Sequence, residues 1–403
     1  MPLSPWNVRV VSPTPVSAVA REMLRSGASP ESLARLLPEA EALAVALEGV
    51  ERPSANLLAQ EMLASGGDAC AEKAETSGLV LVGTRRQFQG LLARLSDKPL
   101  DLPRIGRAVA DALQKYGRRR FDLRLGAYRL AVGDRPLLMG VVNVTPDSFS
   151  DGGKFLEPDR AVAHARQLVQ EGADILDVGG ESTRPGSESV PEDEEMRRVL
   201  PVVETLAEAV QVPISIDTRH ARVAREAVAA GAALVNDITG LQGDAGMARA
   251  VAETGAGVVI MHILGEPKTM QDAPHYANLM ADIVRTLRRG LALAEEAGIP
   301  EERTIVDPGI GFGKTLEHNL EILAQLGQIR SLGRPILVGP SRKRFLGEVT
   351  GVQEPAERTG GTAAACALAV AAGAAILRVH DVAQVRQAVA VAHAVARAYE
   401  TVP

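Results

Sequence analysis

The stretch from Leu137 to Lys154 reads LLMGVVNVTPDSFSDGGK. It begins with an apolar run over 137–142, which has the length and composition of a short buried strand. The chain then turns polar, with one amide, two carboxylates and three hydroxyls around a single aromatic residue, Phe149. A segment of this composition cannot form a core, so we expect a long loop at the end of a strand. A surface turn rich in Asn, Asp and Gly is the alternative interpretation.

The same alternation of apolar run and polar loop continues to the end of the chain. The expected strands are 138–142, 175–178, 214–216, 234–235, 258–261, 305–306, 336–338 and 376–379. Amphipathic helices are expected over 159–171, 192–209, 221–230, 245–254, 277–297, 316–326, 356–372 and 382–399. Eight strand–helix units over about 265 residues predict a TIM (β/α)8 barrel, which typically has about 250 residues. A doubly wound open sheet is the alternative.

The first part of the chain follows a different pattern. Ser29 resembles the N-cap of a helix, 55–63 and 87–95 have helical periodicity, and 79–83 is typical of a strand. The segment 116–130 is expected to lead into the barrel as a β element. We therefore expect two domains, a small N-terminal α/β extension over 1–130 and the barrel over 131–403.

Composition narrows the class of protein. The 403 residues carry a net charge of -6, which gives no general attraction for nucleic acid or an anionic membrane. Only two cysteines occur, far apart, as expected for free thiols in a reducing compartment. The N-terminus lacks a signal-peptide pattern, and the uncharged run 362–377 is better explained by a buried helix and a strand than by a membrane span. We expect a cytoplasmic protein.

Polar residues end all eight expected strands. In a barrel of this kind, the carboxyl ends of the strands build the active site. One polar residue there would be ordinary, whereas eight together predict a site. The strand-end residues are Asn143, Asp177, Asp217, Asn236 with Asp237, His262, Asp307, Ser341 to Lys343, and Arg378 with His380.

Four of these side chains suit a flat heterocycle. Asp217, Asn236, Asp307 and Lys343 offer carboxylates, an amide and an ammonium from different strands. A heterocycle with an amino-amidine edge needs a carboxylate for its paired donors and a cation for its carbonyl or ring nitrogen.

Other strand-end residues suit an anion and a metal ion. Arg378 and His380 are two residues apart on one strand and therefore point the same way. With Asn143 they can hold an anion such as pyrophosphate. Asp147 and Asp151, in the first loop, are hard oxygen ligands suited to Mg²⁺.

Eight motifs occur in the order found in one known family. They are MGVVNVTPDSFSDGG, DVGGESTRPG, ISIDT, NDI, MHILGEPKTMQ, DPGIGFGKT, VGPSRKRFLG and RVHDV. In these motifs, residues 136 to about 396 resemble dihydropteroate synthase, a transferase of folate biosynthesis. The resemblance implies condensation of 6-hydroxymethyl-7,8-dihydropterin pyrophosphate with p-aminobenzoate, giving 7,8-dihydropteroate and pyrophosphate. It also implies a homodimer and competition by sulfonamides.

The resemblance assigns roles by motif position. The pterin would be held by Asp217, Asn236, Asp307 and Lys343, with Phe312 lining its slot. The pyrophosphate would be held by Asn143, Arg378 and His380. Mg²⁺ would be held by Asn143 and Asp151. The p-aminobenzoate pocket would be formed by Phe149, Thr183, Arg184, Pro185 and Ser341. The residues implied in catalysis are Asp147, Asp217 and Lys343, with Asp147 or Asp217 stabilising a cationic methylene carbon.

Several alternatives stay open at this stage. A pterin-dependent methyltransferase has a similar barrel, and a pterin-binding protein without turnover would share the slot. The segment 311–315 resembles a phosphate-binding P-loop, but Pro308 stands where the pattern needs Gly, so we expect a strand–helix loop. His262 is expected to be a hydrogen-bonding or structural residue, and Asp177 and Asp237 are candidate supports of the site. The remaining histidines, expected at the surface, are His164, His220, His275, His318 and His393.

Overall fold

The computed structural model describes residues 16–71, 76–144, 157–182 and 189–398. These residues form two compact units, which divide between Gln114 and Lys115 and again between Ala394 and Val395. No helix in these ranges is both long and apolar enough to cross a membrane.

The first unit is a small antiparallel sheet with helices on one face. Its strands pair in the order β1-β3-β2. Leu79 and Leu81 of β3 are fully buried against the helices, whereas Val80 and Val82, which point to the opposite face, are partly exposed. Ser29 caps α2 by accepting a hydrogen bond from the Ser32 amide, as the sequence predicted. The elements are α1 (Val16–Arg25), α2 (Pro30–Ala40), β1 (Ala42–Glu51), α3 (Arg52–Ala64), β2 (Asp68–Ala71), β3 (Thr76–Thr84), α4 (Arg85–Leu95) and α5 (Leu102–Gly117).

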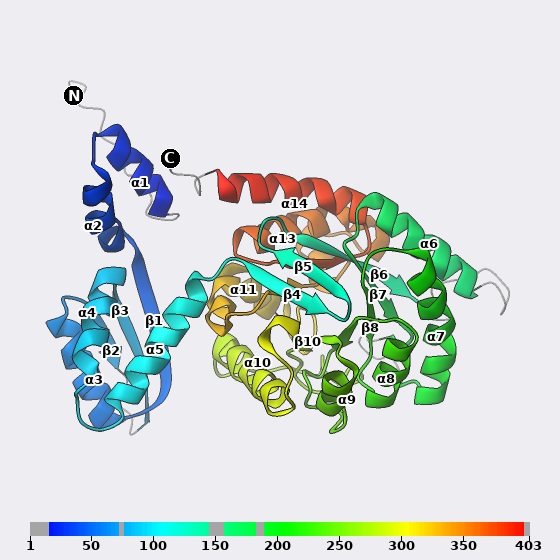
Figure 1. Ribbon diagram of the computed structural model, residues 1–403, viewed down its shortest axis with the longest axis horizontal. Coiled ribbons are helices and arrows are strands. Elements are labelled where there is room, and N and C mark those ends of the chain that lie inside the picture. The colour runs from blue at the N-terminus through cyan, green and yellow to red at the C-terminus, as the bar shows by residue number, and fades with distance from the viewer. Residues whose placement is uncertain (1–15, 72–75, 145–156, 183–188, 399–403) are drawn as a thin grey trace. The chain divides into compact units, whose positions relative to one another are not determined.

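The second unit is the expected barrel (Figure 1). Its eight parallel strands are ordered β11-β10-β9-β8-β7-β6-β13-β12. A parallel bridge between Val306 and Ile336 joins the two ends of that order, so the open-sheet alternative is excluded. The strands are β6 (Leu137–Asn143), β7 (Ile175–Gly179), β8 (Ile214–Asp217), β9 (Leu234–Asp237), β10 (Gly257–Met261), β11 (Thr304–Asp307), β12 (Leu337–Val338) and β13 (Ile376–Val379).

Helices alternate with these strands and cover their outer face (Figure 1). The uncharged run 362–377 divides between α13 and β13, as expected for a buried helix followed by a strand. Among the described α-helices of this unit, only α12 was not anticipated. The helices are α6 (Glu157–Glu171), α7 (Glu192–Ala209), α8 (Ala221–Ala229), α9 (Met247–Thr254), α10 (Leu279–Glu296), α11 (Leu316–Gln325), α12 (Arg344–Thr350), α13 (Thr359–Ala371) and α14 (Val382–Arg397).

A β-hairpin closes the amino-terminal end of the barrel. Its strands are β4 (Phe121–Leu125) and β5 (Tyr128–Val132), so the expected β element before the barrel is confirmed. Leu123, Leu125 and Val132 are buried in one cluster with the first residues of several barrel strands. The boundary expected between residues 130 and 131 therefore falls inside β5. Packing divides the chain earlier, between Gln114 and Lys115, because the hairpin's apolar side chains belong to the barrel core.

Candidate active site

A layer of polar side chains lies above the apolar floor of the barrel. Successive residues of a strand point to opposite faces, so residues two apart share a face. Ile175, Leu234, Ile305 and Ile376 point inward and pack in the floor. The inward residues two positions further along these strands are Asp177, Asn236, Asp307 and Arg378. Alternation thus places the polar residues of different strands around one barrel mouth, as the sequence predicted.

The guanidinium of Arg378 joins two carboxylates across this mouth. Its Nε donates to Oδ2 of Asp177 over 2.6 Å, and its Nη2 donates to Oδ2 of Asp217 over 2.7 Å. The Asn236 amide also donates to Oδ2 of Asp177, over 3.1 Å. Asp177, which is completely buried, is therefore a support that orients both Arg378 and Asn236.

Burial sets the proton affinities of these groups. Removal from water raises the pKa of Asp217 to about 7, although the charge of Arg378 opposes the shift. Burial likewise raises the pKa of Asp307, whose Oδ1 accepts a hydrogen bond of 2.7 Å from the Gly309 amide. Burial opposes the charge of Arg378, but Asp177 and Asp217 outweigh it and raise its pKa. Arg378 therefore stays charged, whereas burial makes Asp217 easier to protonate than a carboxyl group in water.

Lys343 approaches the same mouth from the loop after β12. Its ammonium donates to the carbonyl oxygen of Ile310, and its Nζ lies 4.2 Å from the centre of the Phe312 ring. Burial lowers the pKa of Lys343 to about 7, and Asp307 offsets part of the shift. Lys343, Phe312 and Asp307 are thus neighbours, which makes Phe312 a wall of the same site.

Ser341 and His380 form a pair beside this mouth. The Ser341 hydroxyl lies 3.0 Å from Nδ1 of His380 and also accepts a hydrogen bond of 3.2 Å from the His380 amide. Ser341 is buried, and His380 is half-buried. Asn143 is the last residue of β6 and pairs in register with Gly179 of β7. These three residues therefore come from neighbouring strand ends.

Asp237 supports a turn and offers nothing to the mouth. Its Oδ1 accepts from the amide and hydroxyl of Thr239, over 2.8 and 2.7 Å, and its Oδ2 accepts from the Leu241 amide over 2.8 Å. Both oxygens are therefore used in fixing the loop that follows β9.

A buried lysine next to His262 was missed by sequence reasoning. Nζ of Lys314 lies 3.0 Å from Nδ1 of His262 and donates to the Phe312 carbonyl over 2.9 Å. Burial and the nearby Lys314 lower the pKa of His262 to about 3, so this histidine is a neutral hydrogen-bonding residue, as expected. The sequence marked Lys314 only as part of a P-loop-like pattern. The structure confirms a strand–helix loop here, ahead of α11.

Of the histidines expected at the surface, only His275 is exposed. The other four are half-buried, namely His164, His220, His318 and His393. The ring of His318 packs edge-on against Tyr276 and completes the capping box of α11. His220 lies before α8, 3.7 Å from a carboxylate oxygen of Glu192. Both residues lie at the start of a helix.

Six residues expected in the site lie outside the described ranges. They are Asp147, Phe149, Asp151, Thr183, Arg184 and Pro185.

The chain matches the family model described as pterin binding enzyme over residues 139–380. It is 45% identical over 265 residues to a dihydropteroate synthase of Synechocystis, a match that covers 66% of this chain and 92% of that protein. It is 42% identical over 346 residues to a probable bifunctional folylpolyglutamate synthase/dihydropteroate synthase of Haloferax volcanii, covering 83% of this chain and 41% of that protein.

Solved structures agree with these relatives. The dihydropteroate synthase of Xanthomonas albilineans with 4-aminobenzoic acid is 47% identical, with a TM-score of 0.65, 71% of this chain covered and 99% of the other. The same enzyme in complex with 7,8-dihydropteroate gives 44% identity and a TM-score of 0.62, with 70% and 100% covered. The Yersinia pestis enzyme in complex with a sulfonamide drug is 44% identical, with a TM-score of 0.65. The match covers 68% of this chain and 99% of the other.

Proposed function

The chain belongs to the dihydropteroate synthase family of pterin-binding enzymes, and from that premise we propose how its residues divide the work. It is a transferase of folate biosynthesis that joins a dihydropterin-methyl pyrophosphate to p-aminobenzoate and releases pyrophosphate. The observation that carries the assignment of roles is the polar layer in which Asp177 and Asp217 hold Arg378.

We assign recognition of the pterin to Asp217, Asn236, Asp307 and Lys343. Two buried carboxylates on β8 and β11 suit the paired N–H donors of an aminopyrimidine edge, because each carboxylate accepts two hydrogen bonds side by side. Burial from water raises the pKa of Asp307 and of Asp217. Hydrogen bonds that a ligand donates to these buried carboxylates are therefore stronger than the same bonds in water. Phe312 supplies an apolar wall.

We assign the pyrophosphate to Asn143, Arg378 and His380. Two of the donors of Arg378 are used by Asp177 and Asp217, which leaves further guanidinium N–H groups for a ligand oxygen. His380 is kept in place by Ser341. The leaving group gains negative charge as its bond to carbon breaks, so a fixed cation stabilises that charge.

We propose Mg²⁺ as the metal ion, held by Asn143 and Asp151 together with oxygens of the substrate. An amide and a carboxylate oxygen fit this ion, which binds through few protein groups and keeps other positions for phosphate or water. When bound, Mg²⁺ neutralises charge on the departing pyrophosphate.

The carbon that loses pyrophosphate becomes cationic, and its positive charge is delocalised into the pterin ring. We propose that Asp147 or Asp217 stabilises this cation. The arylamine then attacks as a neutral nucleophile and gives up its proton afterwards, so no strong base is needed. Thr183, Arg184, Pro185, Phe149 and Ser341 would shape the p-aminobenzoate pocket.

The direct test is pyrophosphate release by the full-length protein. The pterin pyrophosphate and Mg²⁺ are supplied with and without p-aminobenzoate, and Lys343→Ala is compared with Lys268→Ala, which changes an exposed lysine. We expect release that needs p-aminobenzoate and is lost only in Lys343→Ala. Equal release by both variants would contradict the role given to Lys343.

We also propose a homodimer in the cytoplasm. Exposed Leu320, Val349 and Leu368 on α11, α12 and α13 support a self-association surface. Cys70 and Cys366 are free thiols, which supports a reducing compartment. Light scattering on the wild type and on Leu368→Glu tests the dimer, which the variant should weaken.

A further inference from the structure

Two glutamates and a histidine gather beside the polar layer of the mouth, and the established reaction does not use them. Glu181 follows β7, Glu195 lies in the first turn of α7, and His220 precedes α8. One ligand atom from each, a carboxylate oxygen or a ring nitrogen, lies within 4.8 Å of the other two.

Glu195 is the member that ordinary packing does not explain. Its side chain is 0% exposed, and neither carboxylate oxygen has a hydrogen-bond partner among the described residues. Burial raises the pKa of Glu195 to about 7, and the nearby Thr218 hydroxyl offsets this only in part. A buried carboxylate without partners costs free energy, so such a group signals an unseen proton, water or cation.

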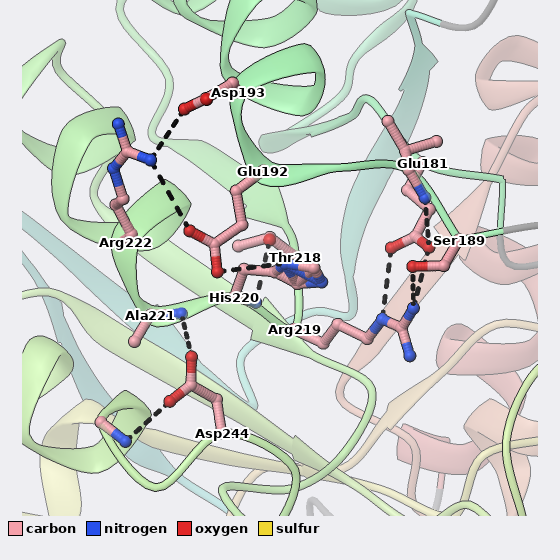
Figure 2. A network of polar contacts seen from close by, with 12 residues as sticks. Glu181, Ser189, Glu192, Asp193, Thr218, Arg219, His220, Ala221, Arg222 and Asp244 are labelled. Carbon is pink, nitrogen blue, oxygen red and sulfur yellow. Dashed lines mark hydrogen bonds and ion pairs between the residues drawn. The ribbon is translucent and has the colours of Figure 1, made fainter.

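The other two side chains are held by neighbours that leave lone pairs available. Glu181 accepts from Arg219 over 3.0 Å and from the Val190 amide over 3.3 Å, and its side chain is 8% exposed. A carboxylate has about four lone-pair positions, so these bonds do not exhaust it. His220 faces the carboxylate of Glu192, and Arg219 faces Glu181 and Ser189 (Figure 2).

A route from solvent reaches the cluster. Glu192, Arg219 and His220 form part of the wall of an open cavity of about 660 Å³. The cavity continues past Thr239 and Asp244, on the loops after β9. A small ion therefore has a path to His220.

We propose that Glu181, Glu195 and His220 bind one divalent transition-metal ion, of which Zn²⁺ is the representative. One imidazole and two carboxylates form a donor set that Zn²⁺ and similar ions prefer, whereas Mg²⁺ prefers oxygen ligands alone. In a tetrahedral site with bonds of about 2.1 Å, ligand atoms stand about 3.4 Å apart. The three ligand atoms, which lie within 4.8 Å of one another, would move closer by side-chain rotation, with Glu192 or water completing the shell.

The consequence would be structural. Glu181 leads into the segment 183–188, and His220 lies three residues after Asp217. An ion bound here would hold the chain after β7, at Glu181, against the chain after β8, at His220. It would also supply the positive partner that Glu195 lacks.

The test measures metal binding in the intact protein without substrates. The chain is stripped with a chelator, dialysed against Zn²⁺ and analysed for bound metal. The variants are Glu195→Gln and His220→Asn. Asp193→Asn is the matched control, because it removes a carboxylate from the same helical turn at an exposed position. Asn143→Ala tests independence from the Mg²⁺ site proposed for the reaction.

We expect one tightly bound Zn²⁺ per chain in the wild type, Asp193→Asn and Asn143→Ala, and at least a tenfold weaker affinity in Glu195→Gln and His220→Asn. Zn²⁺ should also raise the Tm of the wild type but not of His220→Asn, which keeps the buried core of the cluster intact. Absence of stoichiometric binding, or equal binding by all the variants, would overturn the proposal and leave Glu195 as a protonated buried acid.

Discussion

Nη2 of Arg378 lies 2.7 Å from Oδ2 of Asp217, so the last strand of the barrel is tied to a carboxylate of its third strand, across the mouth. The same guanidinium is tied to Asp177 of the second strand. Asp217, to which we assign pterin recognition, therefore also helps to fix the position of the Arg378 guanidinium.

Asp177→Asn should lower catalytic efficiency, although we assign Asp177 no contact with the substrate. The change removes the charge that orients Arg378 and weakens the acceptor for Asn236. We expect kcat/KM for the pterin pyrophosphate to fall about 10- to 100-fold, the usual effect of losing an orienting partner. KM for p-aminobenzoate should stay unchanged, and steady-state kinetics with each substrate varied separately measures both.

Asp237→Asn is the matched comparison. Asp237 is also buried at a strand end, but its oxygens are bonded to Thr239 and Leu241. We expect a loss of about 1–3 kcal/mol in the free energy of unfolding, with little change in kcat/KM. If Asp177→Asn and Asp237→Asn gave the same kinetic profile, the positioning role of Asp177 would be refuted.

Lys343→Met should stabilise the substrate-free protein while abolishing activity. Burial lowers the pKa of Lys343 from 10.5 to about 7, so between these values the unfolded chain holds a proton that the folded chain lacks. Stability therefore rises with pH through this window, and the cost of burying the ammonium is largest below pH 7. We expect the variant to melt roughly 2–4 °C above the wild type at pH 6.

The gain in Tm should shrink toward pH 10. The folded wild-type lysine is then neutral, and deprotonating the unfolded lysine costs little free energy so close to its pKa of 10.5. Pyrophosphate release should fall at least about 10²-fold, the order seen when one preorganised donor is lost. Calorimetric scans at pH 6, 8 and 10 test the sign. A gain that grew with pH would contradict the assignment of the cost to a buried ammonium.

Gly309→Ala should destabilise the loop after β11. Gly309 has φ of +67°, and a Cβ there would lie 1.9 Å from the carbonyl oxygen of His262. The backbone must move to relieve this clash, so we expect the free energy of unfolding to fall by at least about 3 kcal/mol. Gly351 also has positive φ, +77°, but its Cβ would meet nothing within 4 Å. Gly351→Ala should therefore cost only about 1 kcal/mol, and urea unfolding of both variants separates clash from strain.

Removal of the hairpin should weaken the barrel. Leu125 is 0% exposed, and Leu125→Ala should cost about 2–5 kcal/mol. A chain that begins at Lys115 keeps β4 and β5, whereas a chain that begins at residue 131 leaves Leu137 and Met139 uncovered. We expect the longer chain to unfold cooperatively on heating, and the shorter one to aggregate or to unfold at a lower temperature. Identical melting curves would show that the hairpin contributes nothing.

The secondary structure of the barrel and the residues at its mouth could be predicted from the sequence. The eight strands and the helices between them follow from apolar runs bounded by polar loops, and the sequence placed α7 at its observed bounds, Glu192–Ala209. Strand alternation also fixes which residues point inward, so the residues of the mouth, such as Asp217 and Arg378, could be named in advance. These features depend on local periodicity, which the sequence contains in full.

The partners of those residues depended on the tertiary structure. Strand alternation points Asp177 inward and Asp237 outward, but it does not predict that Asp177 holds Arg378 or that Asp237 caps a turn. Strand stagger around the barrel decides which carboxylate a guanidinium reaches. Lys314 beside His262, the orphaned Glu195 and the hairpin under the barrel are likewise contacts between residues distant in the chain. Periodicity tells which face a residue occupies, but only the closed barrel sets the distances across it.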